Sequence, residues 1–187
     1  FNWTMLHYIG ENGVAAVTII MYVLMFASSL YTGYSYGVAP MLSYYYGEQS
    51  YEKLRKLVRS SLKIIGGISL LTVAGSFVLT KPLVSIFARP ANPVYELAFT
   101  GNRICTAALC FIGFNIFASG MFTALSNGLV SAVLAFSRSF VFMMIAMLTL
   151  PAVLGVNGIW LATPVAELMA LALTGGMFVK YRKRYQY

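Results

Sequence analysis

Two ionisable side chains lie deep inside long apolar stretches of this sequence. Arg138 follows nine uncharged residues counted from Leu129, and Glu167 follows eight counted from Ile159. On helices that rise about 1.5 Å per residue, both lie roughly 12–14 Å into their stretches, near the midplane of a hydrocarbon core about 30 Å thick. An unpaired charge there is costly, so the two side chains either pair with each other or face a water-filled cavity. The alternative is structural: Arg138 snorkels to the nearer surface, and Glu167 is protonated and hydrogen-bonded between helices.

Two more residues belong with these charges. Pro164 stands three positions before Glu167, and its missing N–H leaves the carbonyl of Trp160 without a helical partner. We expect Thr163 to satisfy that carbonyl. A kink beside an acid is one way to build a cation or proton site, although a purely structural kink is commoner. Asn115 lies inside another apolar stretch, where it either lines a pocket or makes an interhelical hydrogen bond. The candidate substrate or ion pathway therefore consists of Glu167, Arg138, Asn115 and Pro164.

No set of residues typical of an enzyme or a metal site occurs in the sequence. His7 is the single histidine, and neither a Gly-rich phosphate loop nor an acidic pair with hydrolytic spacing is present. Cys105 and Cys110 are five apart and so point about 140° away from each other on a helix. We expect them to be packing residues. The sequence thus predicts no catalytic residues, no bound metal and no cofactor.

The composition is that of an integral membrane protein. Among 187 residues, 59% are hydrophobic and 10% are charged, and the mean hydropathy is +0.77, far more apolar than a soluble domain. No basic segment with a cleavage site opens the chain, so we expect an internal segment of a longer protein. The fold expected for residues 1–187 is a single all-α lobe. Its complete transmembrane helices are predicted at about 14–37, 61–79, 97–122, 129–150 and 159–179, after the end of a sixth in residues 1–9.

The basic residues are concentrated in two segments. Nine of the thirteen Lys and Arg residues lie in 53–63 and 180–184, each next to an apolar stretch. By the positive-inside rule, the loop 47–60 and the tail 180–187 are cytoplasmic. We interpret both as anchors to anionic lipid rather than as nucleic-acid contacts. The expected location is the cell membrane, crossed several times, with the C-terminus inside.

Small residues near the first basic segment predict helix contact and a hinge. Gly33 and Gly37 stand four apart and share one helix face, which favours close approach of another helix in a bilayer. Pro40 follows and is expected to bend or end the helix.

Several weak motifs occur in an order that carries a family resemblance. GYSYGVAP is followed by YGEQ and a basic helix start; GMFTALSNG, Arg138, Pro151, GVNGIW and ATPVAE come later. This order resembles the C-terminal half of a multidrug and toxic compound extrusion (MATE) transporter, over essentially the whole chain. The resemblance implies a secondary antiporter that expels organic cations and drugs in exchange for protons or sodium. It also implies alternating access with an N-terminal lobe outside this chain.

The sequence departs from one feature of that family. Many members form a sodium site with acids in the seventh and tenth spans. Here the seventh span lies almost wholly outside the chain, and the stretch 97–125 contains no acid. Two alternatives stay open: a lobe of a related flippase for lipid-linked saccharides, which would use a more arginine-rich cavity, and a truncated lobe without transport activity.

The charge distribution predicts the orientation in the membrane. Cysteines substituted near Asn92 should react with a membrane-impermeant thiol reagent added outside cells, and cysteines near Ser50 should not. The opposite labelling pattern would show that the assigned orientation, and with it the number of spans, is wrong.

Overall fold

The computed structural model describes residues 2–187, which form helices and no strand. A 3₁₀ turn, η1 (Thr106–Ala108), joins two helices into one span, and a π-helical turn, η2 (Ser137–Val141), joins two others. The α-helices are α1 (Asn2–Tyr8), α2 (Glu11–Gly47), α3 (Tyr51–Phe87), α4 (Pro93–Cys105), α5 (Leu109–Ala124), α6 (Gly128–Phe136), α7 (Phe142–Leu154) and α8 (Val156–Tyr185).

Five helical stretches in the described part of the chain are long and apolar enough to cross a membrane. They are α2, α3, the α4–α5 span, the α6–α7 span and α8, and α1 precedes them as a single short helix. This confirms the predicted all-α membrane fold of five spans and a terminal helix end.

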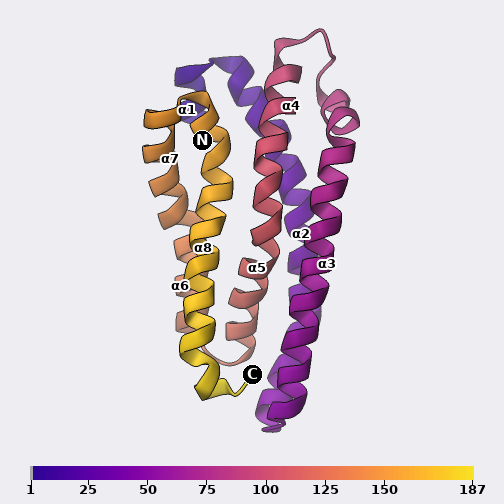
Figure 1. Ribbon diagram of the computed structural model, residues 1–187, viewed down its shortest axis with the longest axis vertical. Helices are drawn as coiled ribbons and strands as arrows, with labels where there is room; N and C mark the ends of the chain where they lie inside the picture. The colour runs from indigo at the N-terminus through magenta and orange to yellow at the C-terminus, as the bar shows by residue number, and fades with distance from the viewer. Residues whose placement is uncertain (1) are drawn as a thin grey trace.

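The spans alternate in direction. Figure 1 shows α2, the α4–α5 span and α8 running one way, while α3 and the α6–α7 span return. The α2–α3 link, the α5–α6 link and the C-terminus therefore lie at one end of the bundle (Figure 1). At that end Arg55 donates from Nε and Nη2 to the backbone carbonyl of Gln186, at 3.3 and 3.2 Å. The two basic segments are thus neighbours; which side of the membrane they face stays a prediction.

The helices extend further than the sequence suggested. Residues 51–60, expected within the loop 47–60, form the first turns of α3, so the link shrinks to residues 48–50. Helix continues there because Leu54 and Val58 are buried in the core while the basic side chains between them point outward. At its other end α3 continues through Lys81 and Pro82 to Phe87, past residue 79, where the span was predicted to end. Likewise, Pro40 does not end α2, which continues to Gly47.

Close helix contact occurs at glycines other than the expected pair. Gly33 and Gly37 are exposed, and a Cβ added to either would meet nothing within 4 Å among the described residues. A Cβ on Gly101 would instead lie 2.6 Å from the Ile20 side chain, and one on Gly113 would lie 2.6 Å from the Tyr31 ring. The glycines of the α4–α5 span let α2 approach closely, because backbone without a side chain permits short interhelical distances.

At this contact Tyr31 of α2 links three spans by hydrogen bonds. The side chain is buried, and its hydroxyl lies 2.7 Å from the Thr72 hydroxyl of α3 and donates to the Leu109 carbonyl of α5 at 3.2 Å. Phe117 and Phe122 of α5 belong to the same apolar core. The α4–α5 span therefore occupies the centre of the lobe, with α2 and α3 on one side and α8 on the other (Figure 1).

Substituting Gly113 tests this packing. Gly113→Ala places a methyl group against Tyr31 and 2.9 Å from the Ile65 side chain, so it should lower the free energy of unfolding by about 1–3 kcal/mol. Gly67→Ala is the control, since a Cβ there meets nothing within 4 Å, and it should be neutral or stabilising by up to roughly 1 kcal/mol. Thermal unfolding in detergent measures both. Equal effects of the two substitutions would contradict the close contact.

Candidate functional site

The two deep charges are brought together between the fourth and fifth spans. Nε of Arg138, on η2, lies 3.6 Å from Oε1 of Glu167, on α8. Glu167 is 9% exposed by side chain and Arg138 is 23% exposed. The separation exceeds the 2.7–2.9 Å typical of a charge-assisted hydrogen bond. The contact is thus an ion pair without a direct hydrogen bond.

Asn115 of α5 holds the other side of the carboxylate. Its Nδ2 donates to Oε2 of Glu167 at 2.8 Å and to the Glu167 backbone carbonyl at 3.0 Å. Its Oδ1 accepts from the hydroxyl of Thr174 at 3.1 Å. Asn115, Glu167 and Thr174 are all buried. Burial of these polar groups is tolerated because each has a partner, and together with Arg138 the network connects three spans.

The backbone beneath Arg138 is irregular. Residues 137–141 form a π-helical turn in the middle of the fourth span, between α6 and α7. Such a turn has one more residue than an α-helical turn, and single π turns occur frequently at functional sites. Here the turn carries the one arginine of the span, whose side chain reaches Glu167 on the neighbouring helix.

Pro164 is one helical turn before Glu167, and the carbonyl that it frees is satisfied by an unexpected partner. The Trp160 carbonyl accepts from Sγ of Cys105 at 3.3 Å, and both groups are buried. Cys105, from α4, therefore takes the role that we had predicted for Thr163. Pro164 is buried inside α8, which continues through it to Tyr185.

A polar pocket adjoins the ion pair. Its volume is about 380 Å³, and Arg138 and Asn115 line it, whereas Glu167 and Pro164 do not. Ser35 contributes from α2 and Ser119 from α5. The remaining lining residues are Thr32, Tyr36, Ile116, Gly120, Thr123, Ala135 and Ser139. Arg138 is the only charged side chain at this pocket among the described residues, and six of the ten other lining residues carry a hydroxyl group.

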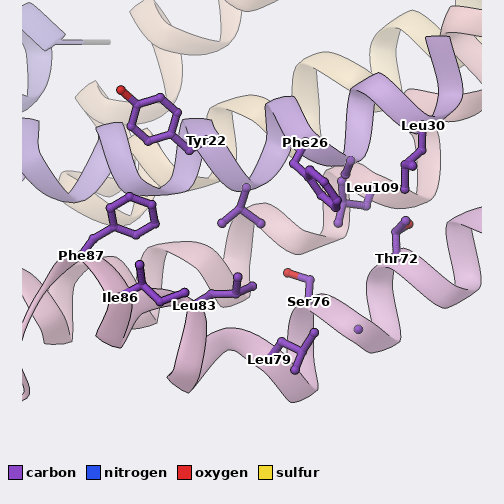
Figure 2. Close-up of a pocket in the computed structure, with 13 residues that line it drawn as sticks. Tyr22, Phe26, Leu30, Thr72, Ser76, Leu79, Leu83, Ile86, Phe87 and Leu109 are labelled. Atoms are coloured by element: carbon purple, nitrogen blue, oxygen red, sulfur yellow. The ribbon is translucent and has the colours of Figure 1, made fainter. Parts of the chain in front are cut away.

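A second pocket, of about 370 Å³, is apolar and lies between α2 and α3. Figure 2 shows Tyr22, Phe26, Ile86 and Phe87 on the two helices that enclose it. These four side chains are largely exposed on the outside of the bundle, where a membrane protein meets lipid. None of the lining residues is charged. We therefore place the candidate site at the polar pocket and its ion pair.

Sequence reasoning missed Thr174 and the serines of the pocket. Thr174 follows Glu167 by seven positions, about two helical turns, so both lie on one face of α8. That spacing could have predicted that Thr174 lies near Glu167. Ser35 and Ser119 come from different spans, and no spacing within one helix predicts that they share a pocket.

Comparison with known proteins identifies the family. The profile of the MatE family matches residues 1–149, and no match is found among curated proteins. An outward-facing multidrug resistance MATE family transporter of the MOP superfamily is 22% identical, with a TM-score of 0.88 over 99% of this chain and 41% of that chain. A Vibrio cholerae MATE transporter in a bent form is 19% identical, with a TM-score of 0.88 over 97% of this chain and 41% of that one.

A third similar structure is a MOP superfamily transporter from Pyrococcus furiosus. It is 22% identical, with a TM-score of 0.88 over 99% of this chain and 41% of its own. The chain thus spans about two fifths of the length of these transporters, and identities this low show the shared fold. Because the family profile covers most of the sequence, the chain belongs to the MatE family and has the fold of one lobe of a MATE transporter.

Proposed function

We propose that the chain is the C-terminal lobe of a secondary antiporter that exports organic cations and drugs in exchange for protons or sodium. The observation that carries this proposal is Glu167, a buried carboxylate in the middle of a membrane-spanning helix. The proposed transporter is a multi-pass protein of the cell membrane with a cytoplasmic C-terminus, and it needs no cofactor besides the coupling ion.

Glu167 is suited to bind a cation because of where it lies. The sequence has five acidic residues, and Glu167 is the only one of them that is buried. Acids inside membrane spans are rare and commonly mark ion pathways or proton relays. The stretch 97–125 contains no acid, which is consistent with a coupling acid in α8 instead.

The surroundings of Glu167 offer further oxygen ligands. Asn115 donates from Nδ2 to Glu167, and its Oδ1 accepts from the hydroxyl of Thr174, so two further oxygen atoms belong to the same network. Hard cations prefer oxygen ligands of these types, and a proton needs only the carboxylate. The proposal therefore covers both coupling ions.

The polar pocket next to this network has a size suited to a small organic molecule. Its volume of about 380 Å³ lies within the range of roughly 300–1,000 Å³ typical of ligand pockets. Transport by alternating access requires a second lobe opposite this one. The N-terminal lobe is accordingly the proposed partner, together with membrane lipid and the exported cation.

Substituting Glu167 in the complete transporter tests the proposal. Glu167→Gln keeps the shape and hydrogen bonding of the side chain but removes its charge, so gradient-driven ethidium export should fall roughly tenfold or more, about 1.4 kcal/mol. Glu96→Gln is the matched control, since Glu96 is exposed near the start of α4, and it should leave export unchanged. Reconstituted vesicles with an imposed proton or sodium gradient provide the measurement. Full export by Glu167→Gln under both gradients would overturn the proposal.

A further inference from the structure

The ion pair creates a difficulty for a cation site, since Arg138 already occupies the place where a cation would bind Glu167. We propose that Arg138 competes with the bound cation for Glu167. Its guanidinium neutralises Glu167 in the empty site, and an incoming cation displaces the guanidinium into the polar pocket. This inference rests on the proposed function and adds to it a residue that tunes affinity.

The two carboxylate oxygens of Glu167 have different partners, at different distances. Oε2 accepts a hydrogen bond of 2.8 Å from Asn115, whereas Oε1 faces Arg138 at 3.6 Å without a hydrogen bond. A fully formed arginine–carboxylate pair has two short, parallel hydrogen bonds. Arg138 is therefore held loosely, while the orientation of the carboxylate is fixed independently of it.

The pocket provides a place for the displaced guanidinium. Arg138 lines the pocket, whose volume is about 380 Å³, so its side chain already borders the free space. Ser35 and Ser139 present hydroxyl oxygens on the wall, and a hydroxyl accepts hydrogen bonds from the five N–H donors of a guanidinium. An arginine that leaves Glu167 therefore exchanges one set of polar partners for another without entering lipid.

Electrostatic repulsion prevents Arg138 and a cation from pairing with Glu167 at the same time. Two positive charges within a few ångströms of each other repel strongly in a medium of low dielectric constant. One carboxylate neutralises only one of them, so Arg138 and a bound cation compete for Glu167. Competition of this kind lowers the apparent affinity for the cation, because binding must first displace the internal guanidinium.

Removing the competitor should strengthen cation binding. In the purified transporter, Arg138→Gln should bind ethidium more tightly, by roughly 5- to 150-fold, the usual range of coupling between two sites. Arg103→Gln removes a positive charge from an exposed residue that packs on Phe77 and Phe99, away from the pocket. This control should bind as the parent does. Unchanged or weaker ethidium binding by Arg138→Gln would overturn the inference.

A second substitution leaves Arg138 in place. Ala135 is exposed and lines the pocket, so Ala135→Leu fills the space that the displaced guanidinium would enter. Sodium is the probe here, because an ion of its size does not itself need the pocket, and sodium binding should weaken at least about fivefold. Ala132→Leu is the control, being exposed on the same helix but outside the pocket. Equal affinities of these two variants would contradict the displacement step.

Glu167→Gln separates this inference from the proposed function. If Glu167→Gln retains full ethidium binding, Glu167 is not the cation site and both proposals fail. If it loses binding while Arg138→Gln does not gain any, the proposed function stands and Arg138 is a structural partner only.

Discussion

Neutralising one carboxylate inside a bundle of apolar helices is the constraint on which the arrangement of this lobe depends. Glu167 is surrounded by membrane-spanning helices, and an uncompensated charge there would be costly. Asn115 and Arg138 approach it from two other spans, at 2.8 and 3.6 Å. Thr174 completes the network through Asn115. The packing of α5, η2 and α8 therefore brings together the polar partners of one acid.

Close packing of the central span makes this approach possible. Gly101 and Gly113 let side chains of α2 and α3 pack directly against the backbone of the α4–α5 span, and Tyr31 links the three spans by hydrogen bonds. With that side of the span fixed, Asn115 is directed toward α8. The π-helical turn brings Arg138 to the same point from the fourth span. Packing on one side of the central span thus positions polar groups on the other.

The spans and the two deep charges were predictable from the sequence, because a charge inside a long apolar stretch is visible without knowing any neighbour. Contacts between spans were not predictable, since they depend on how helices are rotated and displaced relative to one another. Gly33 and Gly37 have the expected spacing but no neighbour in the described structure, whereas Gly113 has no such motif and is closely packed. For the same reason Cys105, not Thr163, satisfies the carbonyl freed by Pro164.

The coupling between Arg138 and Glu167 is the central claim, and a double-mutant cycle on stability measures it directly. The free energy of unfolding of the parent would be compared with those of Arg138→Gln, Glu167→Gln and the double variant. The geometry predicts a non-additive interaction of about 0.5–3 kcal/mol, since residues in contact are coupled by such amounts. Destabilisations that add within about 0.3 kcal/mol would show that the two charges act independently, and would contradict the account.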